Sequence, residues 1–274
     1  MLNRRSRFVI TAMVFAFAFL YIPIVSVVAY SFNESRMVTI WSGFSLKWWQ
    51  ALPENEEMVS AALLSLQIGV VNATVAVILG TFAGVALARY RRFRGRTLFT
   101  GLITAPLVMP EVIMGISMLL LFVMLERLFG WPERGFTTIA IAHITFTMAY
   151  VAVIVQSRLV TFDYALEEAA QDLGARPAKV FFVITLPIIS PALISGWLLA
   201  FTLSIDDLVI TQFVTGPTAT TLPMLVYSSV RRGVSPEINV LASIIVGIVT
   251  LGIIVATIVL QRQQRRRQRE AQAG

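Results

Sequence analysis

The chain has 274 residues, of which 57% are hydrophobic and 14% are charged, and its mean hydropathy is +0.79. Soluble domains carry about 25% charged residues, so this composition excludes an ordinary soluble protein and indicates an integral membrane protein with room for several spans of roughly 20 residues. Cysteine is absent and histidine occurs once, which excludes disulfide frameworks and thiolate sites and argues against a zinc or iron centre.

Six apolar runs follow one another along the chain, and each is long enough to be predicted as a transmembrane helix. The first follows a basic N-terminal segment and is longer than the apolar part of a cleavable signal, so we expect it to remain in the protein. The sequence therefore predicts one all-α transmembrane domain over residues 1–274, with six spans at about 8–31, 60–88, 98–125, 136–156, 188–211 and 238–261.

The second predicted span carries a stripe of small residues. Ala76, Gly80, Gly84 and Ala88 recur every four residues, so they share one face of a helix. Small residues allow two helix backbones to approach closely in a membrane. The stripe predicts a close helix–helix contact.

Three acidic residues lie within the predicted spans: Glu111 in the third, and Asp206 and Asp207 toward the outer end of the fifth. An ionisable group in a span costs roughly 2.5–3.5 kcal/mol on insertion scales, so such groups are usually kept for function. Pro110 loosens the helix beside Glu111, an arrangement that often lines a substrate path. We predict that all three line the path, and their common sign favours a cationic substrate.

Each acid also has a structural alternative. Glu111 could sit in a kinked helix and pair with a neighbouring helix, and the aspartates could face periplasmic water. Adjacent residues of a helix point about 100° apart, so only one aspartate is expected to face the path directly. The single histidine, His143, lies mid-span; we favour a packed, hydrogen-bonded role over a proton relay.

The polar stretch 158–187 separates the fourth and fifth spans and is predicted to form two short helices. Asp163 is a candidate N-cap for the first, Gly174 has the position of its C-terminal glycine, and Pro177 suits the first turn of the second, Ala178–Thr185. One face of the first helix is small and apolar, with Leu166, Ala169, Ala170 and Leu173 at helical spacing. A partner outside the membrane could push on such a rigid segment.

Six spans place both termini on one side of the membrane. That side carries 16 of the 22 Lys and Arg residues, in the N-terminal segment, the loops after the second and fourth spans, and the C-terminal tail. The positive-inside rule therefore predicts that both termini and residues 158–187 are cytoplasmic. The net charge of +7 then reflects topology, and nucleic acid is not an expected partner.

The polar stretch resembles a known family motif. Glu168-Ala169-Ala170, three residues, Gly174, nine residues, Ile184, one residue and Leu186-Pro187 match the EAA loop of the membrane subunits of binding-protein-dependent ABC importers. The resemblance implies a type I importer permease fold in which Glu168–Gly174 forms the coupling helix, seated in a groove of a separate ATPase. The implied ATPase-coupling residues are Glu167, Glu168, Ala169, Ala170, Leu173 and Gly174. An ordinary amphipathic loop is the alternative.

Three further segments resemble the polyamine (putrescine/spermidine) importer permeases: Met109–Gly115, Ser204–Thr211 and Val230–Asn239. This resemblance implies a multi-pass protein of the bacterial inner membrane that transports a polyamine. It implies as partners a second homologous permease in a heterodimer, an ATPase dimer and a periplasmic binding protein, beside membrane lipid.

No GxxxxGK[ST] phosphate loop occurs, so the chain is not expected to be an enzyme or to bind a cofactor. ATP and Mg would belong to the partner ATPase. The alternatives are an ABC importer permease for another solute, such as ferric ion, sulfate, thiamine or a sugar, and a proton-coupled secondary transporter that uses Glu111 or His143. A structural or lipid-binding membrane protein would not explain the intramembrane acids.

Overall fold

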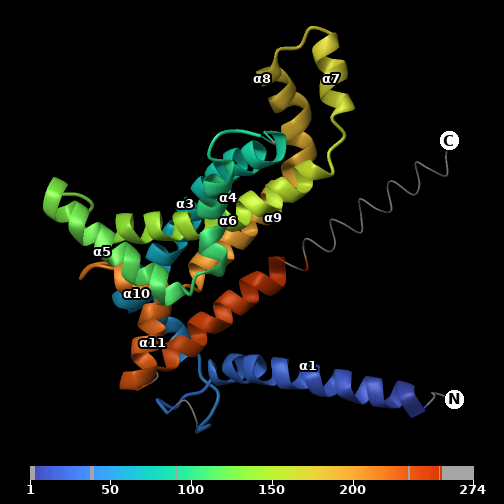
Figure 1. Cartoon of the computed structure of the whole chain (residues 1–274). Coiled ribbons are helices and arrows are strands. Elements are labelled where there is room, and N and C mark those ends of the chain that lie inside the picture. Colours follow the sequence, from blue (N-terminus) through green and yellow to red (C-terminus); the bar gives the residue numbers. More distant parts are fainter. Residues whose placement is uncertain (1–3, 38–39, 91, 234, 253, 255–274) are drawn as a thin grey trace. The chain divides into compact units, whose positions relative to one another are not determined.

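The computed structural model describes residues 4–37, 40–90, 92–233, 235–252 and 254 (Figure 1). Across these residues the chain is helical, apart from loops and one isolated bridge between Asn33 and Phe44, which confirms the predicted all-α class. The chain divides into two compact units, residues 1–59 with 228–274 and residues 60–227. Each is described by itself. The candidate functional residues all lie in the second.

The helices follow one another in this order: α1 Arg4–Tyr30, α2 Lys47–Ala51, the 3₁₀ turn η1 Leu52–Glu54, α3 Glu56–Arg89, α4 Arg96–Val108, α5 Glu111–Phe129, α6 Phe136–Val160, α7 Ala165–Asp172, α8 Pro177–Val180, the π turn η2 Phe181–Thr185, α9 Leu186–Ile205, α10 Val209–Val214 and α11 Leu222–Arg232. A further helix covers Pro236–Gly252.

Five helical stretches of the described chain are long and apolar enough to cross a membrane: Phe8–Tyr30, Glu56–Arg89, Glu111–Phe129, Phe136–Val160 and Pro177–Ile205. The helix Pro236–Gly252 is shorter and falls in the sixth predicted span. The rest of that span, residues 253–261 except 254, lies outside the described residues.

The third predicted span, 98–125, is not one helix. Helix α4 ends at Val108 and α5 begins at Glu111, and Met109 between them has an extended backbone, with φ −75° and ψ 137°. Pro110 explains the break, since proline disfavours the helical conformation of the residue before it and lacks the N–H for the helical ladder. Glu111 therefore lies in the first turn of α5, where a negative charge suits the helix dipole.

The small-residue stripe of α3 packs against α6, which confirms the predicted close contact. A Cβ atom added to Gly80 would lie 2.7 Å from Cβ of Val151, and one added to Gly84 would lie 2.8 Å from the carbonyl oxygen of Ala152. Both distances are shorter than ordinary van der Waals contact, so glycine is required for this approach.

Replacing Gly80 with valine should therefore destabilise the fold, by about 1–3 kcal/mol or more, because extra carbon atoms in a packed interface force the backbones apart. The matched control is Gly101→Val in α4, where an added Cβ would meet no atom within 4 Å. Thermal unfolding of the detergent-solubilised protein measures both. Equal melting temperatures for the two variants would contradict the close α3–α6 contact.

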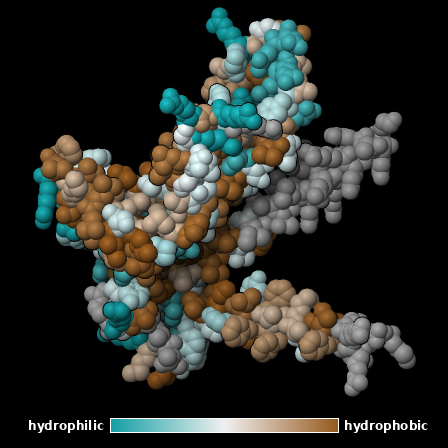
Figure 2. All heavy atoms as spheres, viewed as in Figure 1, coloured by the Kyte–Doolittle hydropathy of each residue, from teal (hydrophilic) through white to brown (hydrophobic). Residues whose placement is uncertain are grey.

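Two apolar clusters hold the helices of residues 60–227 together. The first joins α3, α5, α6 and α10 and includes Ile68, Met114, Phe122, Ile139 and Ile210. The second joins α3, α6 and α9 and includes Ala73, Val151, Val155, Ile189 and Ala200. Figure 2 shows hydrophobic residues over α5, whereas hydrophilic residues gather over α7 and the turn after it. The α6 helix takes part in both clusters, so polar residues on it are held firmly in the core.

Candidate functional site

The EAA loop, residues 158–187, begins with a helix as predicted, but the N-cap residue of α7 is Tyr164, one residue after the predicted Asp163, and its side chain makes no capping hydrogen bond. Asp163 Oδ1 accepts a hydrogen bond of 3.0 Å from the backbone N–H of Ala165, the first residue of α7. The helix ends at Asp172, and Gly174, just after the C-cap Leu173, has a positive φ of +84° and donates its N–H to the carbonyl of Gln171 at 2.8 Å. Glycine adopts this left-handed conformation at little cost, which explains why the helix ends here.

The second helix of the loop is longer than predicted. Instead of a separate helix Ala178–Thr185, the chain is helical from Pro177 through the π turn η2 into α9, which ends at Ile205. Pro187 accounts for the π turn, because it has no N–H to donate and its ring would clash with the carbonyl four residues earlier. A displacement at Pro177 therefore acts on one continuous helical stretch.

The six predicted coupling residues do not share one environment. Leu173 is 90% exposed, and Glu168, Ala169 and Gly174 are exposed as well, whereas Ala170 is half-buried. Glu167 is the exception, with only 5% of its surface exposed. Five of the six are thus open to a partner, and the sixth points into the protein.

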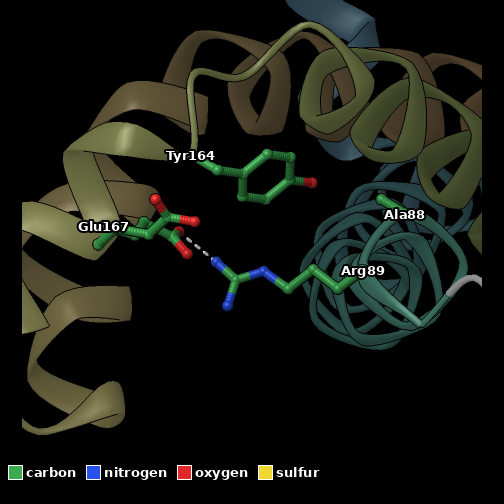
Figure 3. Close-up of a pocket in the computed structure, with 5 residues that line it drawn as sticks. Ala88, Arg89, Tyr164 and Glu167 are labelled. Carbon is green, nitrogen blue, oxygen red and sulfur yellow. Dashed lines mark hydrogen bonds and ion pairs between the residues drawn. The ribbon is translucent and has the colours of Figure 1, made fainter.

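Glu167 is held by residues from two other elements. Arg89, the last residue of α3, forms an ion pair with the Glu167 carboxylate, and the Thr185 hydroxyl donates to the same oxygen. Arg89 Nη2 also donates to Thr185 Oγ1 at 3.2 Å. Figure 3 shows the Arg89 side chain leaving the end of α3 and reaching toward Glu167.

This contact borders an open pocket of about 440 Å³, lined by Ala88, Arg89, Tyr164, Glu167 and Glu168. The sequence alone predicts only a topological role for Arg89 and no functional role for Thr185. No local pattern could have linked residues that are 78 and 96 positions apart. The spacing that identified the EAA loop says nothing of which residue anchors it.

The two adjacent aspartates lie in a break between α9 and α10, and their environments differ. Asp206 is exposed, whereas the Asp207 side chain is only 6% exposed. Asp207 Oδ1 accepts hydrogen bonds of 2.8 Å from both the N–H and the hydroxyl of Thr211, and it lies 3.2 Å from His143 Nε2. Asp207 is thus occupied by contacts within the chain, and only Asp206 is presented outward.

His143 is buried, with 2% exposure, and both ring nitrogens have partners. Nδ1 lies 2.7 Å from Ser204 Oγ, and Nε2 lies 2.9 Å from Thr211 Oγ1. The hydrogen bonds of the His143 ring are satisfied when Nε2 carries the proton and donates it toward Thr211 and Asp207, while Nδ1 accepts a hydrogen bond from the Ser204 hydroxyl. The predicted packed, hydrogen-bonded histidine is confirmed.

The polar contacts continue from α6 to α3 and α9. Thr147 Oγ1 lies 2.9 Å from both Asn72 Oδ1 and the carbonyl of His143, and Asn72 Nδ2 donates to the carbonyl of Ala200 at 2.9 Å. All of these side chains are buried. Buried polar groups that satisfy one another fix the relative positions of their helices, so this network locks α3, α6, α9 and α10 together.

Glu111 is exposed at the start of α5. The hydrogen bonds and ion pairs that the structure describes do not join it to Asp206 or Asp207. The structure thus brings Asp207 together with His143, a residue that sequence reasoning had kept separate, and leaves Glu111 and Asp206 as the two exposed acids of the predicted path.

Comparison with known proteins places the chain among transport proteins. Residues 76–270 match the family described as "Binding-protein-dependent transport system inner membrane component". The putrescine transport system permease protein PotI of Escherichia coli (strain K12) is 56% identical over 98% of this chain and 96% of its own length. The spermidine/putrescine transport system permease protein PotC of the same strain is 42% identical over 90% of this chain and 91% of its own length.

A solved structure supports the fold. The crystal structure of a bacterial ABC transporter involved in the import of the acidic polysaccharide alginate matches with a TM-score of 0.68 over 95% of this chain and 98% of that chain, at 18% identity. The predicted ABC importer permease fold is confirmed, as is a multi-pass protein of the bacterial inner membrane. The chain therefore belongs to the binding-protein-dependent transport system inner membrane components.

Proposed function

We propose that the chain is the transmembrane permease subunit of an ATP-driven importer for putrescine or a related polyamine. The observation that carries this proposal is the 56% identity to a putrescine permease over nearly the whole chain, against 42% for a spermidine/putrescine permease. In this proposal the whole chain serves as one permease domain, with both termini and the EAA loop in the cytoplasm.

The proposed importer complex contains further subunits. A second homologous permease forms the heterodimer, an ATPase dimer carries ATP and Mg, and a periplasmic binding protein delivers the polyamine. ATP binding closes the ATPase pair, which displaces α7. The continuous helix from Pro177 to Ile205 supports this step, because it links the loop directly to the membrane core.

The exposed acids define the part of the path that this chain supplies. A polyamine carries a positive charge on each amine at neutral pH, so it needs carboxylates that are not already paired. Asp206 and Glu111 meet that condition by exposure. Asp207 contributes indirectly, since its carboxylate accepts the backbone N–H of Thr211 in the first turn of α10 and so fixes the break from which Asp206 projects.

Uptake of labelled putrescine by proteoliposomes that contain the whole complex tests the proposal, with spermidine as competitor. We expect uptake that requires both ATP and the binding protein. ATP turnover without polyamine movement would leave the importer in place and make the cargo another solute, such as ferric ion, sulfate, thiamine or a sugar. Uptake driven by a proton gradient without ATP would overturn the importer itself.

A further inference from the structure

The contact around Glu167 joins three elements that are far apart in the sequence. Arg89 ends α3, Glu167 lies in the first turn of α7, and Thr185 is the last residue of the π turn before α9. Each of the three side chains touches the other two. A mutual contact of this kind fixes the position of α7 more tightly than any single pair would.

The chemistry of the contact makes it stiff. Glu167 is 5% exposed, and the guanidinium and the hydroxyl meet at one carboxylate oxygen. Hydrogen bonds between ionised groups are short and strong, and reduced exposure to water strengthens them further. Removing one partner leaves a buried charge uncompensated, so this contact resists opening.

Without this contact, α7 would be held mainly through the chain at its two ends. Residues 161–164 connect it to α6, and residues 173–176 connect it to α8; the second connection is largely exposed, whereas Phe162 in the first is buried. A push on α7 would then reach the membrane core through those two connections and through the packing of α7 on α8 and η2, but not directly through α3. The Arg89 contact adds a direct route into α3, which packs against α6 through Gly80 and Gly84.

We propose that Arg89, Glu167 and Thr185 form a tie that carries displacement of α7 into α3 as well as into α9, with Arg89 as a positioning residue for coupling. This inference rests on the proposed function, in which a partner ATPase moves α7. The two adjacent glutamates of the loop then have different roles. Glu168 is exposed to a partner, whereas Glu167 is buried and contacts residues of this chain.

The first test uses the complex purified with its partner subunits and reconstituted in proteoliposomes. Arg89→Ala should leave the complex assembled and hydrolysing ATP, but lower the putrescine transported per ATP by about tenfold, within the roughly 5–150-fold range of coupling between sites. Glu167→Gln, which keeps the shape and loses the charge, should lie between Arg89→Ala and the unmodified protein. Arg92→Glu, an exposed arginine nearby, serves as the control for changed charge.

Charge exchange separates a tie from a merely structural role. In the double variant Arg89→Glu with Glu167→Arg, the ion pair is reversed and the Thr185 hydroxyl can still donate to one partner and accept from the other. We expect the transport ratio to recover well above that of either single exchange. A double variant as poor as the singles, or an Arg89→Ala variant with a normal ratio, would overturn the tie.

A distance measurement reports the tie without any cargo. The chain has no cysteine, so Tyr90→Cys at the end of α3 and Ala165→Cys on α7, both exposed, give two spin-label sites in this subunit. The label distance should be the same with and without ATP in the intact protein, and should shift or broaden with ATP in Arg89→Ala. If the label distance in Arg89→Ala is also the same with and without ATP, the tie is refuted. This result does not depend on whether putrescine is the cargo.

Discussion

Alanine at Asp207 should destabilise the protein by about 1–3 kcal/mol or more, because it leaves buried donors of His143 and Thr211 without their acceptor. The same substitution at Asp206 should change stability by no more than about 0.5 kcal/mol, as is usual for an exposed residue. The two positions are adjacent and chemically identical, so each variant is the matched control of the other. Unfolding of the detergent-solubilised protein gives both values.

Putrescine uptake per folded molecule should be reduced more by Asp206→Ala than by Asp207→Ala, the opposite of their effects on stability. An ion pair at 4 Å is worth about 1 kcal/mol in bulk water and about 4 kcal/mol near a protein surface, so Asp206→Ala should raise the KM for uptake by about tenfold or more. Asp207→Ala should reduce uptake mainly by reducing the amount of folded protein. If Asp206→Ala transported normally while Asp207→Ala stayed folded and lost uptake, the assignment of the exposed acid would be reversed.

Hydropathy and local motifs predicted the architecture well where the cause is local. The helix Ala165–Asp172 and its glycine end near Gly174 depend on residues within a few positions of one another, and the structure contains both, although the N-cap is Tyr164 and not Asp163. The prediction of one helix over residues 98–125 is wrong, because hydropathy does not distinguish one long apolar helix from two consecutive ones. Pro110 predicts a loosened helix, whereas the structure has a complete break there.

The candidate site was less predictable because its contacts are not local. His143 and Thr211 are 68 positions apart, and Arg89 and Glu167 are 78 apart. Helical spacing predicted that the two aspartates would face different directions, but could not say which one the core would take. That choice depends on where α6 places His143, which only the packed structure reveals.

Proline at Gly174 should uncouple the protein from the proposed partner ATPase while leaving the membrane helices folded. Gly174 has a φ of +84°, whereas proline is fixed near −65°, and the substitution also removes the N–H that bonds the carbonyl of Gln171. The turn between α7 and α8 must then change, so Leu173 and Glu168 would no longer meet the ATPase in the right orientation. Glu168→Arg should uncouple in the same way, by reversing an exposed charge.

Gly130 provides a control with a similar positive φ at the end of α5. Its φ is +69°, its N–H donates to the carbonyl of Glu126 at 2.8 Å, and an added Cβ would meet nothing within 4 Å, as at Gly174. Replacing an interior helical residue with proline costs about 3 kcal/mol, so proline at either glycine should lower stability by a similar amount up to that size. Only Gly174→Pro should abolish ATP-driven uptake. Because the strain is matched, normal uptake by Gly174→Pro, or equal loss in both variants, would show that α7 does not couple this chain to ATP.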